Sequence, residues 1–259
     1  GHSTGKSAVS SVVFEYHLSC LGHCVWTTAP SMEQVHKLWA EVMVHRDQAT
    51  RFLPGTIVAG GPSVAPRLKT ANKALWAKGF STNRAERAQG LHIPELLIIM
   101  DEGAGVDEHI WIAVRSSLAS AGVKLLVLGN PNEKRNSFWR IFWGKDLRNR
   151  WSKHHISSLE TPNISDAERK YFYEVILPAF RSGRYDLAEL EKGLPPASEP
   201  VIPGLAAMDW VIDQMADYRD QPNVFDNRVL GEIANDDSKT TTIPGSYIDA
   251  AMDLWLELE

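Results

Sequence analysis

The feature that most constrains the fold is an unbroken apolar run, residues 96–100, followed directly by Asp101 and Glu102. Consecutive apolar residues without polar alternation are typical of a strand buried on both faces of a parallel sheet. Side chains at the carboxyl end of such a strand face the crevice in which open α/β sheets hold their ligands. We therefore predict an α/β fold in which Asp101 and Glu102 line a ligand site.

The first seven residues, GHSTGKS, carry the pattern of a phosphate-binding loop, because Gly-Lys-Ser stands directly before an apolar-periodic run. Backbone N–H groups of such a loop, and of the helix that it opens, point at phosphate oxygens. We predict that Thr4, Gly5, Lys6 and Ser7 bind the phosphates of a nucleotide. The Lys6 ammonium should also assist catalysis, and the Ser7 hydroxyl should be a ligand of Mg²⁺. The complete pattern includes a glycine before residue 1, so we expect a fragment that lacks the strand leading into the loop.

Together, the loop and the two carboxylates predict a site that hydrolyses a nucleotide. Asp101 would hold the same Mg²⁺ as Ser7, and Glu102 would polarise the attacking water as the catalytic base. Asn130 follows a second predicted buried strand, 123–128, so its amide would lie at the same sheet edge and sense the γ-phosphate. Two alternatives remain open. Asn130 is a turn residue before a proline, or the loop and the carboxylates are a helix start and a strand end that bind no nucleotide.

Composition limits the classes of protein to which this chain can belong. At 259 residues it can bury a large core, and because it has no run of 18 apolar residues we expect no membrane-spanning segment. The net charge of −5 argues against a protein that coats DNA over its whole surface. Cys20 and Cys24 have no second pair with which to complete a tetrahedral zinc site, so we expect two small buried residues in a reducing cytosol.

The spacing of apolar residues predicts the elements around these motifs. A helix after the loop should end at Gly22 and bury one face, made of Val9, Val12, Val13, Tyr16 and Cys20. A strand over 24–29 and a second helix, capped by Ser31 and Gln34, should follow. The second helix should bury Val35, Leu38, Trp39, Val42 and Met43. Beyond it we expect a hairpin around 71–73.

Basic residues are concentrated in residues 134–155, which contain seven Lys or Arg and one acid. The cations predicted to contact DNA phosphates are Lys134, Arg135, Lys145, Arg148 and Arg150. Contact with a neighbouring subunit is the competing use of these charges. Phe138, Ile141 and Phe142 recur at helical spacing, which favours a core segment for the aromatic part of the stretch.

Arg84 and Arg87 lie in a second polar stretch, 83–92, directly before the central strand. Polar residues this dense between core elements usually indicate a surface or a site. We expect one of the two arginines to act in trans on the γ-phosphate of a neighbouring subunit. The alternative, a salt bridge to a nearby acid, stays open.

With these residues in place, the order of motifs resembles that of the large terminase subunit of tailed phages, over nearly the whole chain. The segment Thr28-Ala29-Pro30-Ser31 is similar to the motif that follows the first helix in that family. Residues 89–92 precede the Asp-Glu strand as they do there, and Leu128-Gly129-Asn130-Pro131 resembles the coupling motif. Residues 203–232 resemble the bridge to a carboxy-terminal RNase H-like nuclease.

The resemblance implies a P-loop NTPase fold: a mostly parallel sheet with helices on both faces, plus a small, mainly helical appendage. It implies a P-loop ATPase core over 1–160, without its first strand, and a helical lid or linker region over 161–259 that leads to a nuclease domain outside this chain. Nuclease activity is therefore not expected.

The activity implied by the resemblance is hydrolysis of ATP, with Mg²⁺, to translocate double-stranded DNA into the prohead. The implied partners are double-stranded DNA, the small terminase subunit, the portal protein and further copies of the chain in a ring, with no membrane. The implied location is the host cytoplasm and, transiently, the prohead portal. The alternatives are a helicase or remodelling P-loop ATPase, and a non-catalytic assembly fragment.

Overall fold

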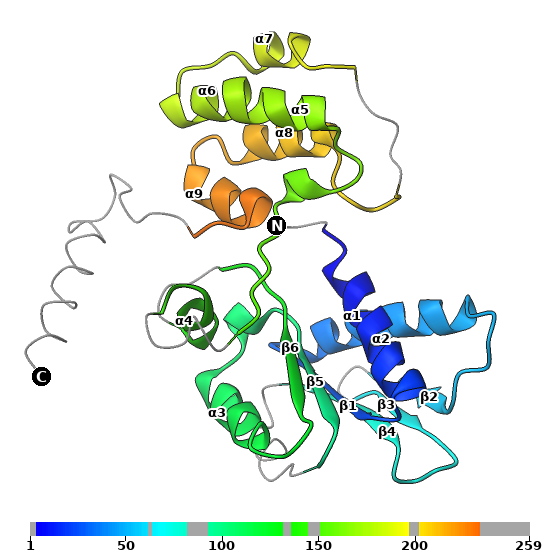
Figure 1. Ribbon diagram of the computed structural model, residues 1–259. Coiled ribbons are helices and arrows are strands. Elements are labelled where there is room, and N and C mark those ends of the chain that lie inside the picture. Colours follow the sequence, from blue (N-terminus) through cyan, green and yellow to red (C-terminus); the bar gives the residue numbers. More distant parts are fainter. Residues whose placement is uncertain are drawn as a thin grey trace, which may run out of the picture. The chain divides into compact units, whose positions relative to one another are not determined.

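The computed structural model describes residues 4–61, 64–81, 93–131, 136–144, 151–196 and 202–233. Contacts divide the chain into two compact units. The first, Gly5–His154, is called the sheet unit here, and the second, His155–Glu259 with Gly1–Thr4, is called the helical unit. Figure 1 labels the elements of both.

The sheet unit is built on six strands in the order β2-β3-β4-β1-β5-β6. Strands β4, β1, β5 and β6 are parallel to one another, whereas β2 and β3, and β3 and β4, are antiparallel pairs. The strands are β1 Cys24–Ala29, β2 Thr56–Val58, β3 Arg67–Lys69, β4 Trp76–Ser81, β5 Leu96–Met100 and β6 Lys124–Val127. The predicted strand 96–100 is β5, and all of its side chains are buried between β1 and β6. The predicted mostly parallel α/β sheet is confirmed.

Helices cover both faces of the sheet (Figure 1), and the alternation of side chains along β5 divides the core between them. Leu97 and Ile99 pack in the core that includes residues of α1 and α2, whereas Ile98 and Met100 pack in the core that includes residues of α3 and α4. The helical segments are α1 Lys6–Glu15, η1 Tyr16–Cys20, α2 Met32–Asp47, η3 Gly103–Gly105, α3 Glu108–Ser117 and α4 Ser137–Trp143. The predicted arrangement, a sheet with helices on both faces, is thus observed.

Helix α2 begins as its sequence predicts. The Ser31 hydroxyl accepts the Gln34 backbone N–H, and the Gln34 side chain accepts the Ser31 backbone N–H, which completes the capping box. Val35, Leu38, Trp39 and Val42 are buried, whereas Met43 is 40% exposed. Trp39 fixes the helix on the sheet, because its Nε1–H donates to Thr27 Oγ1 at 2.8 Å and its ring packs edge-on against Phe14 of α1.

The predicted buried face of the first helix is wrong except at Val13, which is partly buried against the core. Val9, Val12 and Tyr16 are more than half exposed, and Cys20 is exposed as well. The face that packs inward is made of Ser10, Ser11, Phe14, His17 and Leu18. Two physical reasons account for the difference: polar side chains of α1 pair with α2, and the segment Tyr16–Cys20 is a π-helix, which changes the spacing of side chains around the axis. The predicted end at Gly22 is confirmed by its left-handed φ of 70°.

Two smaller predictions have different outcomes. Residues 70–75 turn between the antiparallel strands β3 and β4, so the predicted hairpin around 71–73 is confirmed. The second predicted buried strand, β6, is instead an edge strand among the described strands, and Leu125, Leu126 and Val127 are only partly buried. Because an edge strand has a neighbour on one side alone, its side chains are less covered than those of β5.

The helical unit contains η4 Ser158–Glu160, α5 Asp166–Tyr171, η5 Phe172–Ile176, α6 Leu177–Ser182, α7 Leu187–Lys192, α8 Met208–Asp217, α9 Pro222–Phe225 and η6 Asp226–Leu230. Its core centres on the rings of Phe172, Phe180 and Phe225, which pack against residues of α8. The predicted helical appendage is therefore present, while the proposed domain limits stay a prediction. None of the described helices is both long enough and apolar enough to cross a membrane.

Candidate functional site

Asp101 and Glu102 lie where β5 ends, in a tightly fixed backbone. The Asp101 N–H donates to the Thr28 carbonyl at 2.8 Å, which continues the β1–β5 ladder by one residue. The Asp101 Oδ1 accepts the Glu102 N–H at 3.0 Å. Glu102 adopts the left-handed conformation, with φ 48° and ψ 48°. This conformation is uncommon for a residue other than glycine and costs roughly 1–3 kcal/mol. Such strain is often found at functional sites.

The start of α1 is built to present backbone donors. Gly5 has a φ of 77°, a conformation that glycine adopts without steric penalty, and the helix begins at the next residue, Lys6. Gly5 offers no side chain to cap the helix, and no acidic residue lies in the first turn. The first N–H groups of a helix have no partner within the helix, and its dipole favours an anion there. Ser7 is the second helical residue and is partly exposed.

The structure brings Lys6 together with both carboxylates. Burial lowers the pKa of the Lys6 ammonium, while the charges of Glu102 and Asp101 act to raise it. Burial is also the main reason why the pKa of Asp101 is raised, and the neighbouring charge of Glu102 adds to this shift. The Glu102 N–H and the charge of Lys6 oppose it. Lys6, Asp101 and Glu102 thus form a group of mutually interacting charges at the carboxyl edge of the sheet.

Asn130 lies at this edge too. The Leu128 N–H donates to Met100 O at 2.9 Å, and the Leu128 carbonyl accepts from the Gly103 N–H at 2.7 Å, so the segment after β6 runs beside the segment after β5. Asn130 is 1% exposed, and its Oδ1 has no hydrogen-bond partner among the described residues. A buried oxygen without a partner is costly unless a ligand or water satisfies it.

Thr28 is a residue that sequence reasoning did not assign to the site. It is fully buried near the end of β1, in register with Met100, and its Oγ1 has no partner in the described part of the chain. Its neighbour Thr27 points to the opposite face and is satisfied by Trp39. The available signal was a pair of hydroxyl residues, Thr27 and Thr28, near the carboxyl end of a strand whose other residues are apolar.

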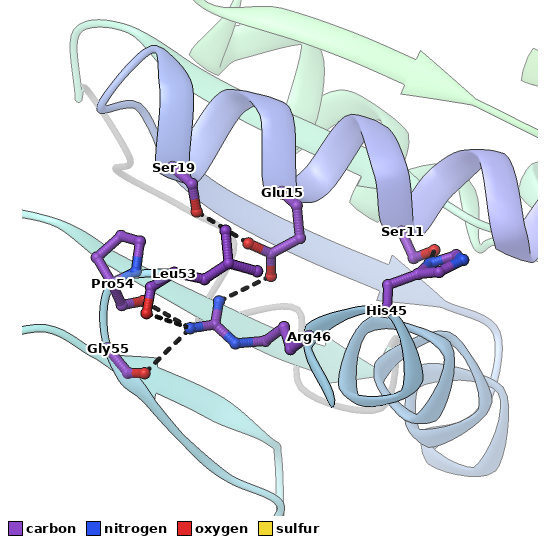
Figure 2. A network of polar contacts seen from close by, with 8 residues as sticks. All are labelled: Ser11, Glu15, Ser19, His45, Arg46, Leu53, Pro54 and Gly55. Atoms are coloured by element: carbon purple, nitrogen blue, oxygen red, sulfur yellow. Dashed lines mark hydrogen bonds and ion pairs between the residues drawn. The ribbon is translucent and has the colours of Figure 1, made fainter. Parts of the chain in front are cut away.

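A polar network anchors α1, the helix that carries Lys6 (Figure 2). Arg46 of α2 donates from Nη1 to Glu15 Oε1 at 2.8 Å, and both side chains are nearly buried, at 11% and 12% exposed. Its Nη2 donates to three carbonyls of the following loop, those of Leu53, Pro54 and Gly55. Ser19 donates to the other Glu15 oxygen at 2.9 Å. Sequence reasoning missed this network because its charged partners lie 31 residues apart.

A second contact between the same helices lies nearer the start of α1. Ser11 Oγ and His45 Nδ1 are 2.5 Å apart (Figure 2). Ser11 is completely buried and also donates to the Ala8 carbonyl. The two contacts hold α1 against α2 at two places along its length, so the position of Lys6 is tied to the packing of α2.

The roles of the other predicted functional residues stay predictions. Thr4 precedes Gly5 in the chain but belongs to the helical unit by its contacts, so its role stays a prediction. The predicted trans-acting arginines and DNA-contacting cations lie outside the described residues: Arg84, Arg87, Lys134, Arg135, Lys145, Arg148 and Arg150. The motif at 89–92 lies outside them as well. Phe138 and Ile141 are buried in the core, which confirms the alternative interpretation of that aromatic segment.

Comparison with known proteins gives a likeness in structure alone. No protein-family model matches the sequence, and no curated protein matches it. The crystal structure of the HK97 bacteriophage large terminase is similar with a TM-score of 0.57 and 14% identity, over 90% of this chain and 45% of that one. A mutant form of the large terminase ATPase domain of Thermus phage P74-26 is similar with a TM-score of 0.50 and 14% identity, over 90% of this chain and 86% of that one.

A third similar structure is the large terminase of a thermophilic bacteriophage in complex with ADP, with a TM-score of 0.50 and 12% identity. The match covers 66% of this chain and 42% of that one, so the matched part of this chain spans less than half of the length of these two large terminase chains. At such identities the likeness concerns the fold. The chain has the α/β P-loop NTPase fold of the ATPase domains of phage large terminases.

Proposed function

We propose that this chain is the ATPase motor portion of a phage large terminase, which hydrolyses ATP to translocate double-stranded DNA into the prohead. The observation that carries the proposal is the charged site at the carboxyl edge of the sheet, where Lys6 at the start of α1 interacts with Asp101 and Glu102 at the end of β5. A helix start that favours anions, beside carboxylates that favour a cation, is suited to a phosphate chain with a divalent metal ion.

The residues present fit ATP and Mg²⁺. Backbone N–H groups at Thr4, Gly5, Lys6 and Ser7 would hold the phosphates, with the Lys6 ammonium as a mobile charge. The Ser7 hydroxyl and the Asp101 carboxylate are oxygen donors of the kind that Mg²⁺ prefers. Bound Mg²⁺ would neutralise charge on the phosphate oxygens. The unpartnered Asn130 Oδ1 supports a further polar ligand at this edge. The ADP complex of a similar terminase supports a nucleotide in this fold.

Each side chain then has a defined task. Glu102 is the general base: its carboxylate would accept a proton from the water that attacks the γ-phosphorus. The left-handed backbone conformation of Glu102 turns the chain sharply after Asp101. The two adjacent carboxylates can therefore have different tasks. Lys6 would stabilise negative charge on the phosphate oxygens. Asn130 would contact the γ-phosphate or the attacking water, and it would lose this contact when the phosphate leaves.

The wider assignments follow from the terminase-like fold. We assign 1–160 to the ATPase core and 161–259 to a helical lid or linker that leads to a nuclease domain. Double-stranded DNA, the small terminase subunit, the portal protein and further copies of the chain in a ring are the proposed partners. The proposed place of action is the host cytoplasm and, transiently, the prohead portal.

Release of phosphate from ATP tests the proposal. The protein should release phosphate with Mg²⁺ and lose this activity when EDTA is added. Lys6→Ala should lose binding of a fluorescent ATP analogue together with phosphate release. The control is Lys37→Ala, which removes an exposed lysine of α2 paired with Glu33 and should leave both quantities unchanged. Equal ATP binding and phosphate release by Lys6→Ala and Lys37→Ala would mean that the assigned site is wrong.

A further inference from the structure

Three exposed cations form a row on the antiparallel part of the sheet. Arg67 and Lys69 lie on β3 and Lys78 lies on β4, with Arg67 directly opposite Lys78 and Lys69 directly opposite Trp76. Residues that alternate along a strand share a face, and so do residues that lie opposite each other. Arg67, Lys69 and Lys78 therefore project from one side of the sheet. This set is called the basic strand face.

The sequence around the basic strand face is free of acidic residues. Although the chain has 32 acidic residues and a net charge of −5, no Asp or Glu occurs between Asp47 and Glu86. The same interval contains six Lys or Arg, and four of them, Arg67, Lys69, Lys73 and Lys78, lie on or between β3 and β4. The positive charge of this region is thus local and is not balanced by its neighbours in the chain.

The arrangement is unfavourable for the folded protein by itself. Like charges directly opposite each other on paired strands are destabilising, and Arg67 and Lys78 are such a pair. Among the described residues no carboxylate forms an ion pair with Arg67, Lys69 or Lys78. A row of exposed cations that repel one another is typical of a surface that binds an anion with several charges.

The basic strand face is separate from the nucleotide site. In the strand order, β4 is two steps and β3 three steps away from β5, which at about 4.8 Å per step amounts to about 10 Å and about 14 Å. Lys78 is in register with Trp26 of β1, whose side chain packs in the core that includes residues of α3. The cations are thus fixed on the same rigid sheet that carries Asp101 and Glu102, so a polymer held by them would be mechanically connected to the site of hydrolysis.

We propose that the basic strand face holds the phosphate backbone of duplex DNA. Lys and Arg contacts to phosphates position a protein on DNA without reading its sequence, as a translocating motor requires. A single strand is less suited, because its binding uses exposed aromatic rings for base stacking, and here the Trp76 ring is already covered by Lys78 Nζ at 4.6 Å from its centroid. The choice of DNA as the polyanion rests on the proposed function, whereas the location of the surface does not.

The test measures affinity for a duplex of arbitrary sequence over a series of salt concentrations, by fluorescence anisotropy. The variant Arg67→Gln/Lys69→Gln/Lys78→Gln should bind at least about tenfold more weakly, and its log–log salt slope should shrink by about 0.9 for each phosphate that the variant no longer neutralises. The control Lys37→Gln/Lys170→Gln/Lys192→Gln changes the net charge equally through exposed lysines elsewhere and should keep the parent's affinity and slope.

Two further variants separate DNA binding from folding and from ATP chemistry. Arg67→Lys/Lys69→Arg/Lys78→Arg keeps every charge and should bind within about twofold of the parent, since phosphate contacts of this kind depend on charge. The neutralised triple variant should melt within about 3 °C of the parent, because relief of the repulsion between Arg67 and Lys78 offsets the lost contact of Lys78 with the Trp76 ring. Lys6→Ala should keep duplex binding in the absence of nucleotide, so failure of the ATPase assignment would leave this test valid.

Unchanged affinity and salt slope in the neutralised variant overturn the proposal, and so does an equal loss of affinity in the control variant. Weaker binding that is accompanied by a melting temperature more than about 3 °C below the parent's also counts against it, because the effect would then come from the fold. If polyglutamate binds to the parent but not to the neutralised variant, while duplex DNA binds equally to both, the face is a contact for an acidic protein and the DNA assignment is wrong.

Discussion

Arg46 Nη1 lies 2.8 Å from Glu15 Oε1, and this nearly buried ion pair joins the two helices on one face of the sheet. Removing one partner leaves the other charge buried and unpaired, which typically costs about 3–5 kcal/mol of stability. Arg46→Met should lower the free energy of unfolding, measured by urea denaturation, by about that amount. It also deprives three loop carbonyls of their donor.

The double variant Arg46→Met/Glu15→Leu separates the ion pair from the rest of the network. Because it removes both charges, it should be more stable than Arg46→Met alone. The exposed pair of Glu33 and Lys37 on α2 provides the control, and Glu33→Gln should leave the denaturation midpoint unchanged. Equal effects of Arg46→Met and Glu33→Gln would show that the Arg46 network does not anchor α1.

Thr27 and Thr28 provide a matched pair on adjacent positions of β1. Thr27→Val removes the acceptor for the Trp39 Nε1–H and should lower stability by about 1–3 kcal/mol, because a buried donor loses its partner. Thr28→Val removes a hydroxyl without a partner among the described residues and should leave stability unchanged or raised. If the Thr28 hydroxyl contacts the bound nucleotide or its water, Thr28→Val should still lower the rate of ATP hydrolysis by about tenfold or more.

The two measurements distinguish a functional from a structural hydroxyl. Thermal melts give the stability of each variant, and phosphate release at saturating ATP gives the rate. A Thr28→Val protein that hydrolyses ATP at the parent's rate would exclude Thr28 from the site. A Thr28→Val protein as destabilised as Thr27→Val would mean that its hydroxyl has a partner in the folded protein.

The strand that positions the carboxylates could be predicted from sequence, whereas the packing of α1 could not. Residues 96–100 are apolar throughout, and only a central position in a parallel sheet buries both faces of such a strand. In α1, by contrast, two faces compete: Val9, Val12 and Tyr16 follow helical spacing, and so do Ser10, Phe14 and Leu18. The second face is buried because Ser11, which belongs to it, and Glu15 pair with α2. A single sequence does not display such partners.

The residues of the site also differ in whether the sequence alone predicts them. Lys6, Asp101 and Glu102 belong to local patterns, a glycine-lysine-serine helix start and an acidic strand end, and can be recognised one segment at a time. Thr28 and the Arg46 network depend on register between strands and on contacts between helices, which are set by the tertiary structure. Residues that support a site from another element are therefore the ones that sequence reasoning misses.

The stability of the sheet unit should fall at mildly acidic pH because of His17. Burial lowers the pKa of His17, and the nearby charges of His23 and Lys124 lower it further. The unfolded chain, with an ordinary histidine pKa of about 6.5, therefore binds more protons than the folded chain as the pH falls below that value. The free energy of unfolding should decrease there, by at most about 1.4 kcal/mol per pH unit for this one group.

The measurement is urea denaturation as a function of pH for the parent and for His17→Gln. The variant cannot take up the proton, so its stability should depend less on pH between neutrality and about pH 5. His109→Gln, a change at an exposed histidine of α3, is the control and should retain the parent's pH dependence. An identical pH dependence in the parent and in His17→Gln would contradict the role of His17.

The most direct test of the central claim separates nucleotide binding from nucleotide hydrolysis at Glu102. Glu102→Gln keeps the size and polarity of the side chain but removes the base, whereas Glu95→Gln makes the same change just before the opposite end of β5. Phosphate release in a single turnover should fall by about 10²–10⁴-fold in Glu102→Gln, with affinity for Mg·ATP retained, and should be unchanged in Glu95→Gln. Hydrolysis by Glu102→Gln within about twofold of the parent would contradict the assignment of this site as an ATPase centre with Glu102 as its base.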